Sequence, residues 1–551
     1  MRCISVFFLK FCFFLITQTT AQTPRELAES IGLRLMAETK YEFVLKPMKL
    51  EQEKTHIIDL TQHADFQRAQ YHEISFELEP LEKSNVLENG HGTGVVYLSL
   101  SHSIGKVQIV LDDSILFKSI NSKHTQPKRL DYDFLKFQHN IPIKLTKSKH
   151  KLVFNFSPKD SLNARLYFAF TEKNGMQKAV KTTRLNSELW LAPPSVSAFP
   201  DNIGLSDWRY YTGAFLTALF DVSNHFKLDT FRGYFKQNMA FFLKNKEKIR
   251  AERKKYGLID SPFSLYFRST MLDDLGTQSL ATLIYHKYLV KNDPEATAVF
   301  TKAQQDWQKN VNVLPDGTFT RLTPDSMTVQ SDDLMMGGFS LVRMSQILKN
   351  DKMLDDAARA SIGYHTYLFD NKTKLYRHAF STKTKEQSCC SWARGLGWMM
   401  LTNAEILKNA PPQYQSAKDA KRTKFKLILQ NFQATCAALL PYQNENGAFH
   451  QILTDKNTYL ETSATAMFIG AFADGVTQGW LPKADFELAI LRGWAYLKSQ
   501  IQDDGKVKNI VRGTPILTST EAYNQQKANL NDPRGLGAVL WACIAMDKFL
   551  K

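Results

Sequence analysis

Residues 332–349, DDLMMGGFSLVRMSQILK, are followed after three polar residues by residues 353–368, MLDDAARASIGYHTYL. In both segments apolar side chains recur every three or four residues, which is the period of an amphipathic α-helix. Two such helices with a short polar connection predict a helical hairpin, in which the second helix returns alongside the first. This unit decides the fold, because the C-terminal half of the chain repeats it.

The helical period begins at about residue 207 and continues to the C-terminus. Its apolar stripes come in pairs, and successive pairs lie about 60 residues apart. This pattern predicts an (α/α)6 toroid, a closed ring of six hairpins that needs twelve helices. Eleven stripes are present, at residues 208–222, 229–245, 273–291, 295–312, 332–349, 353–368, 392–408, 418–440, 461–477, 483–500 and 534–549.

The twelfth helix is expected near the N-terminus. Residues 25–38, RELAESIGLRLMAE, form an amphipathic pattern that precedes a region of different character. We expect this helix to pack into the toroid, so that the intervening domain is inserted after the first toroid helix. The predicted domains are a signal peptide (1–21), the N-terminal helix (22–44), a β-domain (45–190), a proline-containing linker (191–206) and the toroid (207–551).

Between about residues 70 and 175 the apolar residues alternate with polar ones. Alternation with short polar turns is typical of half-buried antiparallel strands. Several such strands predict a small β-sandwich, so the predicted fold class is multidomain, with an α-helical toroid and a small antiparallel β-sandwich. The clearest runs are residues 72–78, 94–100, 106–111, 151–156 and 165–170.

The N-terminus has a short basic start, an apolar run of about a dozen residues, and then small and polar residues up to Ala21. This pattern predicts a secretory signal peptide that is cleaved after Ala21. The alternative is an uncleaved membrane anchor, but the run is short for a bilayer span and Lys10 interrupts it. We therefore expect an exported protein without a membrane anchor, either periplasmic or secreted.

The chain has 70 Lys and Arg residues against 54 Asp and Glu, a formal net charge of +16. In an exported protein, a basic field steers an acidic partner such as an anionic polysaccharide towards the surface. The basic residues are spread along the chain and no nucleic-acid motif occurs, so we expect no nucleic-acid partner. The simpler alternative is that the lysines maintain solubility. The sequence does not predict an oligomeric state.

Four cysteines lie beyond the predicted signal peptide. Cys436 and Cys543 occur in apolar helical runs and are expected to be buried. Cys389 and Cys390 are adjacent, which is an unfavourable arrangement for an ordinary disulfide. No cysteine spacing indicates a zinc site or a disulfide framework.

Two adjacent pairs of carboxylates occur where a predicted helix begins, Asp273-Asp274 and Asp332-Asp333. An isolated Asp at a helix N-terminus is most often a cap. Adjacent helical residues point about 100° apart, so one member of each pair can face a central cavity while the other caps. Two such pairs in one toroid would bring two carboxylates to one pocket, as acid–base chemistry on a sugar requires.

A further segment, Ser391–Trp398, places an arginine between two tryptophans. Indoles stack on sugar rings, and a guanidinium pairs with a carboxylate; the alternative is that Trp392 and Trp398 are core residues. His378 is a further polar group between helices, although an isolated histidine is more often structural. We find no motif for a metal, a nucleotide or a nucleophilic serine, and expect no cofactor.

At these motifs the helical region resembles glycoside hydrolase family 105, the unsaturated rhamnogalacturonyl and related glycuronyl hydrolases, which are relatives of family 88. The motifs occur in the family's order and span about residues 207–551. They are Asp207-Trp208 with Tyr211 and Gly213, Leu272-Asp273-Asp274-x-Gly276, Asp332-Asp333-Leu334-x-Met336, Trp392-Ala393-Arg394-Gly395-x-Gly397-Trp398, Gly447 with Tyr459–Met467, and Asn531-Asp532-Pro533-x-Gly535-x-Gly537.

The resemblance implies an (α/α)6 toroid that hydrates the C4=C5 double bond of a terminal unsaturated uronic acid without a metal. The position of Asp332 is that of the acid that protonates C4 and then activates water for C5. Asp273 matches the second pocket carboxylate. A semi-buried acid beside another carboxylate is expected to have a raised pKa, which suits protonation of an enol ether.

We predict two catalytic residues, Asp332 and Asp273. Two positions depart from the family pattern, because Leu396 replaces a common Asn and Arg534 replaces a common His; Arg534 would suit a sulfate or a second carboxylate. The predicted substrate-binding residues are His378, Trp392, Arg394, Trp398, Trp208 and Arg534.

The predicted function is removal of the terminal unsaturated uronic acid from anionic oligosaccharides of the ulvan or rhamnogalacturonan type. Two alternatives remain open from the sequence. A toroidal polysaccharide lyase would need a Tyr, His or Lys base and would generate the double bond that the hydrolase consumes. A non-catalytic glycan-binding protein would use the β-domain.

Overall fold

The computed structural model describes residues 22–47, 55–59, 72–78, 92–100, 104–119, 139–145, 150–158, 165–172, 181–182, 195–200, 205–256, 261–322, 326–410 and 420–551. The expected signal peptide and half of the expected linker lie outside these residues. The chain divides into two compact units, each described by itself. One comprises Met1–Tyr41, Asp201–Lys246 and Phe263–Lys551, and the other comprises Glu42–Pro200 and Glu247–Pro262.

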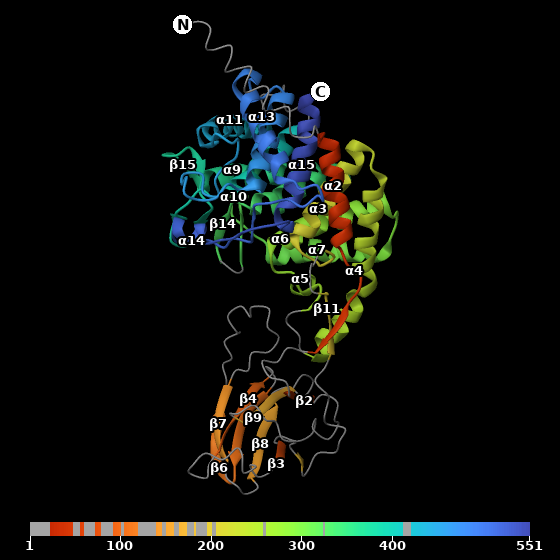
Figure 1. The fold of residues 1–551 in the computed structure, drawn as a ribbon, viewed down its shortest axis with the longest axis vertical. Helices are drawn as coiled ribbons and strands as arrows, with labels where there is room; N and C mark the ends of the chain where they lie inside the picture. The colour runs from red at the N-terminus through yellow and green to blue at the C-terminus, as the bar shows by residue number, and fades with distance from the viewer. Residues whose placement is uncertain are drawn as a thin grey trace. The chain divides into compact units, whose positions relative to one another are not determined.

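The first unit is helical and is organised around a closed inner ring. Each member of the ring contacts the next, and the last contacts the first; α3, α6 and α15 can be followed in Figure 1. The members are α3 (Tyr210–Phe226), α6 (Leu272–Ile284), η5 (Leu334–Phe339) with α8 (Ser340–Leu348), α10 (Ala393–Lys408), α12 (Thr462–Thr477) and α15 (Pro533–Leu550).

A second set of helices packs outside this ring. Each contacts an inner helix through side chains or backbone. This alternation of inner and outer helices is consistent with an (α/α)6 toroid. The outer helices in the described part of the chain are α2 (Pro24–Glu38), α4 (Asp229–Tyr256), α7 (Pro294–Asn310), α9 (Asp351–Leu368), α11 (Ala420–Leu439) and α13 (Lys483–Gln500), with the short helices α5 (Ser264–Arg268) and α14 (Thr520–Asn524) between them.

The N-terminal helix α2 lies in the helical unit, alongside α15 and α3 (Figure 1). It begins with a capping box, because the Thr23 side chain accepts from Glu26 N–H and the Glu26 carboxylate accepts from Thr23 N–H at 2.7 Å. Its apolar stripe, which includes Leu27 and Ile31, is fully buried. Burial of each large aliphatic side chain stabilises this docking by about 1.5–3 kcal/mol.

Glycines allow the inner helices to approach closely. A Cβ atom at Gly276 of α6 would lie 1.8 Å from the carbonyl oxygen of Met336 in η5. A Cβ atom at Gly213 of α3 would lie 2.6 Å from the carbonyl carbon of Thr277 in α6. The backbones of three successive ring members are therefore in direct contact at these two positions.

The second unit contains two antiparallel sheets. One has five strands in the order β10-β3-β8-β5-β6 and the other has four in the order β2-β9-β4-β7. All five strands expected from the alternating pattern are confirmed. The strands are β2 (Thr55–Asp59), β3 (His72–Leu78), β4 (Gly92–Leu100), β5 (Ile104–Leu111), β6 (Ser114–Ser119), β7 (His139–Leu145), β8 (His150–Pro158), β9 (Arg165–Glu172) and β10 (Lys181–Thr182), and a separate pair is formed by β1 (Val44–Pro47) and β11 (Ser195–Ala198).

Period-two burial is visible on the strands of this unit whose side chains are described. Leu152 and Phe154 of β8 are buried, and so are Ile141 and Ile143 of β7. Alternate side chains of a strand point to the same face. Each sheet therefore presents one apolar face to a core.

A network of charges joins the C-terminal ends of the inner helices. Arg343 of α8 donates to Asp221 of α3 at 2.5 Å and to Glu405 of α10 at 3.2 Å. Lys408 lies 3.0 Å from both Glu405 and Asp474 of α12. These residues line a cavity of about 350 Å³, and the network connects four helices of the ring at this end.

The network predicts an acid-sensitive contribution to stability. Burial alone would raise the pKa of Glu405, but Lys408 and Arg343 lower it from 4.5 to about 2. Because the pKa of Glu405 is lower in the folded state than in the unfolded state, ionised Glu405 stabilises the fold. This contribution is complete at pH values above the unfolded-state pKa of 4.5 and disappears as the pH falls towards 2. Glu405→Gln should therefore cost about 3 kcal/mol at pH 7. Urea unfolding should show the difference from wild type shrinking below about pH 4.5; a difference independent of pH would contradict the assignment.

Candidate active site

The inner helices run in the same direction around the ring. Five of them contribute their C-terminal halves to the cavity that contains the charge network. Their N-termini therefore lie at the opposite end, where unpaired backbone N–H groups and the helix dipoles favour negative charge. Most of the predicted site residues lie in or just before the first turn of an inner helix: Asp273, Asp332, Trp392, Arg394, Arg534 and Trp208.

A three-stranded sheet places Asp332 and His378 next to each other. β14 (Thr328–Gln330) pairs with β17 (Ala379–Ser381), which in turn pairs with β18 (Glu386–Gln387). Asp332 follows β14 and His378 directly precedes β17. The Ser331 N–H donates to the His378 carbonyl at 2.9 Å, and His378 Nε2 lies 3.7 Å from Asp332 Oδ2.

Arg321, which the sequence did not indicate, connects the two carboxylate pairs. Its guanidinium binds Asp333 through Nε at 2.9 Å and Nη2 at 2.6 Å. Nη2 also lies 3.4 Å from Asp273 Oδ1. The aspartates of α6 and of the segment before η5 are therefore held together by one charged side chain.

One member of each carboxylate pair is less deeply buried than the other. The side chains of Asp332 and Asp273 are 15% and 12% exposed, whereas that of Asp333 is 1% exposed. Asp274 is also buried, and its Oδ1 accepts from Tyr210 N–H at 2.7 Å. The expectation that the second carboxylate caps its own helix is wrong, because Asp274 binds the first turn of α3 and Asp333 binds Arg321.

The expected raised pKa is found on the buried carboxylates, not on Asp332. Burial raises the pKa of Asp333 to about 7 although Arg321 opposes this, and burial together with Asp273 raises the pKa of Asp274. Burial would also raise the pKa of Asp332, but His378 and Arg321 lower it below its usual value. The sequence-based expectation for the pKa of Asp332 is therefore wrong for the protein without substrate.

The His378 ring is fixed by two aromatic neighbours. Its Nδ1 lies 2.6 Å from the Tyr523 hydroxyl, and its centroid lies 4.5 Å from that of Trp392. Three buried polar atoms of the site, Asp273 Oδ1, His378 Nε2 and Trp392 Nε1, make no hydrogen bond to the described residues. Buried polar atoms are nearly always satisfied, so these atoms are available to a ligand or to water.

Arg394 has a different role from the one predicted. Its guanidinium donates to the carbonyls of Val511 and Arg512, the second at 2.8 Å. It also lies 4.9 Å from the Trp392 ring centroid and is almost fully buried. These contacts anchor the segment at residues 511–512 beside α10, so Arg394 acts on the backbone and not as a ready-made partner for a substrate carboxylate.

The two other tryptophans are packing residues in this structure. Trp208 is buried and contacts Phe242 and Tyr266, with centroid distances of 4.3 Å and 5.0 Å. Trp398 is buried on α10. Both indoles are buried, so neither offers an exposed face for stacking on a sugar, and the structure favours packing roles for Trp208 and Trp398.

Arg534 is the most exposed of the predicted binding residues, at 31%. Its Nη1 lies 3.0 Å from both oxygens of Asp532, and its guanidinium lies 5.5 Å from the Tyr211 ring centroid. Tyr210 lies in the electrostatic field of Arg394, Arg534 and Asp273, and burial raises its pKa to about 12. Arg534 and Tyr210 thus border the same polar region as Asp273.

Three functional candidates were missed from the sequence: Arg321, Tyr210 and Tyr523. Arg321 follows the short strand β13 (Phe319–Thr320) and pairs with Thr328, a location with no motif. Tyr210 adjoins the Asp207-Trp208 motif, which was a usable signal. Tyr523 is 145 residues from His378, so only the folded chain brings them together.

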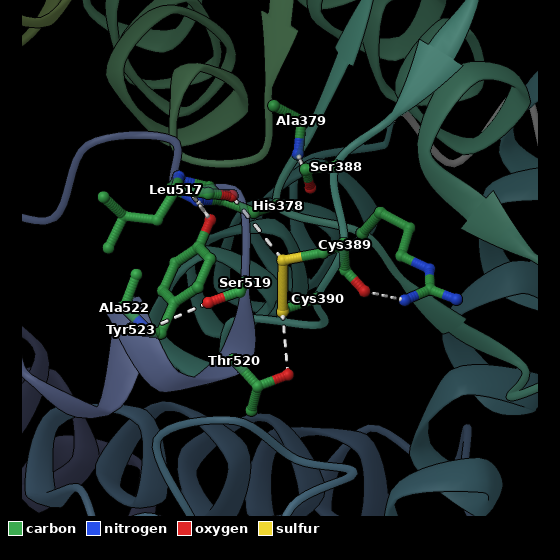
Figure 2. The surroundings of a disulfide bond; sticks show 11 residues. His378, Ala379, Ser388, Cys389, Cys390, Leu517, Ser519, Thr520, Ala522 and Tyr523 are labelled. Atoms are coloured by element: carbon green, nitrogen blue, oxygen red, sulfur yellow. Dashed lines mark hydrogen bonds between the residues drawn. A yellow bond between two sulfur atoms is a disulfide. The ribbon is translucent and has the colours of Figure 1, made fainter.

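The adjacent cysteines are joined by a disulfide, contrary to the expectation from their spacing (Figure 2). Cys390 is buried beside Trp392 and Tyr523, whereas Cys389 is exposed. Cys436 and Cys543 are free and buried, as predicted.

Two further properties concern the described residues as a whole. Among them, none of the helices combines the length and apolar character needed to span a bilayer. Over the same residues, His, Cys, Asp and Glu side chains do not gather in groups of three or more that could hold a metal ion.

Solved structures with a similar fold support the toroidal arrangement. A possible member of the GH105 family from Salmonella enterica has a TM-score of 0.52 at 18% identity, over 67% of this chain and 88% of that chain. A family 105 glycoside hydrolase of C. acetobutylicum has the same TM-score at 19% identity, over 62% of this chain and 95% of that chain.

Curated relatives match part of the chain. An unsaturated rhamnogalacturonyl hydrolase of Bacillus subtilis is 29% identical over 196 residues, which are 35% of this chain and 53% of the relative. An unsaturated 3S-rhamnoglycuronyl hydrolase of an Alteromonas species is 23% identical over 221 residues, which are 39% of this chain and 50% of the relative. The chain thus spans about half the length of these relatives.

The sequence model of glycosyl hydrolase family 88 matches residues 197–550, which are more than half of the chain. This region contains the whole inner ring, both carboxylate pairs and His378. The chain therefore belongs to glycosyl hydrolase family 88 and is related to the family 105 hydrolases.

Proposed function

We propose that the protein removes a terminal 4,5-unsaturated uronic acid from anionic oligosaccharides by hydration of the C4=C5 double bond. The observation that carries this proposal is the pair of carboxylates Asp332 and Asp273, the less buried member of each pair, beside His378 at the N-terminal end of the helical ring. The names of the two curated relatives, which describe hydrolases of unsaturated glycuronyl substrates, point in the same direction.

In the proposed reaction, Asp332 delivers a proton to C4 and the cationic centre at C5 takes up water. The same carboxylate, now ionised, accepts a proton from that water. The hydrated sugar is a hemiketal, so its ring opens and releases the remaining saccharide. Each step needs one group that exchanges a proton at the sugar face, and Asp332 is the most exposed carboxylate of the two pairs.

The lowered pKa of Asp332 requires that the substrate itself favour the protonated form. An unsaturated uronic acid carries its own carboxylate, and a like charge close to Asp332 raises its pKa. Exclusion of water by the bound sugar acts in the same direction. We therefore propose that substrate binding raises the pKa of Asp332, so that this carboxylate takes up a proton when the substrate binds.

The remaining charged groups have supporting roles. Arg321 holds Asp273 and Asp333 in place, so that Asp273 can accept hydrogen bonds from sugar hydroxyls or stabilise positive charge at C5. Arg534 borders the same region and carries a partly exposed guanidinium. This group suits a carboxylate or sulfate on the sugar behind the uronic acid.

The parent polymer is proposed from charge alone. The net charge of +16 and the guanidinium of Arg534 favour a sulfated polymer of the ulvan type over a pectic rhamnogalacturonan. We also propose that the two antiparallel sheets form a β-sandwich and that the chain is exported to the periplasm, where such oligosaccharides arrive.

The test is to follow the ultraviolet absorbance of the C4=C5 double bond. The purified protein should consume this absorbance with oligosaccharides generated by an ulvan lyase, and more slowly with those from a rhamnogalacturonan lyase. A rise of absorbance with intact polymer would identify a lyase instead. Binding without any change in absorbance would identify a glycan-binding protein.

A further inference from the structure

We propose that the Cys389–Cys390 disulfide is a positioning element of the active site, which holds both the backbone and the ring of His378 beside Asp332. The inference rests on the proposed function only in assigning the acid chemistry to Asp332. Neither the sequence pattern nor the family membership indicates such a role for the two cysteines.

The disulfide-containing segment binds the backbone on both sides of His378. The His378 N–H donates to the Cys390 carbonyl at 2.9 Å, and the Arg377 guanidinium donates to the Cys389 carbonyl. Beyond them, the Ala379 N–H donates to the Ser388 hydroxyl oxygen at 3.0 Å, and the Ser388 N–H donates to the Ala379 carbonyl at 2.7 Å. The position of the histidine backbone therefore depends on the geometry of the two cysteine residues.

The ring of His378 is held by a chain of hydrogen bonds from a distant segment. The Leu517 N–H donates to the Tyr523 hydroxyl oxygen at 3.3 Å, and that hydroxyl lies 2.6 Å from His378 Nδ1. Burial raises the pKa of Tyr523, so the phenol keeps its proton and remains a hydrogen-bond partner of Nδ1. The other ring nitrogen, Nε2, lies 3.7 Å from Asp332 Oδ2.

The two sulfur atoms contact this same distant segment (Figure 2). Cys389 Sγ lies 3.5 Å from the Leu517 carbonyl oxygen, and Cys390 Sγ lies 3.5 Å from the Thr520 hydroxyl. The disulfide-bonded pair Cys389–Cys390 therefore contacts both groups of residues that hold His378. Its carbonyls bind the backbone of His378 and the side chain of Arg377, and its sulfur atoms contact the segment 517–523, which binds the His378 ring.

A bond between adjacent cysteines closes a small ring that includes their shared peptide group. Closure removes torsional freedom from that peptide, and reduction restores it. The Cys390 carbonyl and the contacts with residues 517–520 would then sample a wider range of positions, and His378 would follow them.

The experiment compares the full-length wild type, oxidised and reduced, with the double variant C389S/C390S. Dithiothreitol supplies the two electrons and two protons that convert the disulfide to two thiols, and leaves as its cyclic disulfide. Reduction should lower kcat about tenfold. It should also shift the high-pH limb of the activity profile to higher pH, because the pKa of Asp332 rises when the contact with His378 is lost. The double variant should behave like the reduced wild type and not respond to dithiothreitol.

Two comparisons separate positioning from simple stabilisation. His378→Gln should produce the same shift of the pH limb, and C389S/C390S should add little to it, because coupled residues are non-additive. The ring signals of His378 in a histidine-labelled NMR spectrum should change on reduction, and this measurement does not depend on activity. It also separates the two proposals: a wild type inactive on unsaturated oligosaccharides would refute the proposed function while the NMR signals still test the disulfide.

The proposal is overturned if complete reduction leaves kcat, the pH limb and the His378 signals unchanged. A fall in melting temperature alone, with those three properties intact, would show a purely structural disulfide and would also overturn it. If C389S/C390S fails to fold, reduction of the folded wild type below its melting temperature provides the same comparison.

Discussion

Replacing Asp332 with asparagine is expected to lower kcat on an unsaturated oligosaccharide by about 10³- to 10⁴-fold while KM changes by less than about threefold. Asparagine has nearly the same shape, so it can still contact the sugar and His378. It has no proton to give to C4 at neutral pH and cannot accept one from water. The same side chain serves both steps in the proposed reaction, so both are lost together.

Initial rates of double-bond absorbance loss at several substrate concentrations will measure this effect. Asp503→Asn is the matched control, because Asp503 is an exposed carboxylate outside the site and its replacement should leave kcat unchanged. Melting temperatures should show that both variants are folded. An Asp332→Asn protein with more than a tenth of wild-type kcat would show that another group protonates the sugar.

Replacing Gly276 with alanine is expected to destabilise the helical unit by about 3 kcal/mol or more. The added Cβ atom would lie 1.8 Å from the Met336 carbonyl oxygen, well inside van der Waals contact, and a backbone atom cannot rotate away. The helix α6 and the π-helix η5 must therefore separate. Gly276 is three residues from Asp273 and Met336 is four from Asp332, so this movement should also displace these two carboxylates and reduce kcat.

Gly233→Ala provides the matched control for this substitution. Gly233 lies in helix α4, and a Cβ atom there would meet no atom within 4 Å. Alanine has the higher helix propensity, so this variant should gain about 0.5–1 kcal/mol. Urea unfolding of the two variants under the same conditions gives the comparison. Equal stabilities would mean that α6 and η5 can separate without cost, against the close packing described above.

The helices can be predicted from the sequence because their periodic pattern is a local property of the chain. Residues 483–500 form one predicted helix and coincide with α13, since the three-to-four-residue period and the polar loops at both ends are carried by neighbouring residues. The strand over His72–Leu78 was equally clear from alternation. Helix α4 continues to Tyr256, beyond the predicted end at residue 245, because its last turns are rich in Lys, Arg and Glu and carry no apolar stripe.

The active site can be predicted only in part, because its properties depend on contacts between segments that are distant in the sequence. The carboxylate pairs could be found as neighbours in sequence, but their pKa values depend on Arg321 and His378, which come from other segments. The sequence marks Arg394 as unusual, because it lies between two tryptophans, yet its partners are carbonyls more than 100 residues away. A role that is set by such distant contacts has no local pattern.

The arrangement of the paired carboxylates is therefore determined in two stages. The sequence by itself determined that each pair stands at the start of a helix of a repeating toroid, because periodicity and helix-start residues are local properties. Only the tertiary structure decided that Asp332 and Asp273 are less buried than Asp333 and Asp274, since burial depends on which neighbouring segments, here those of Arg321 and Tyr210, bind one carboxylate of each pair. The disulfide belongs to the second stage as well, because its adjacent cysteines acquire a role only where residues 517–523 fold against them.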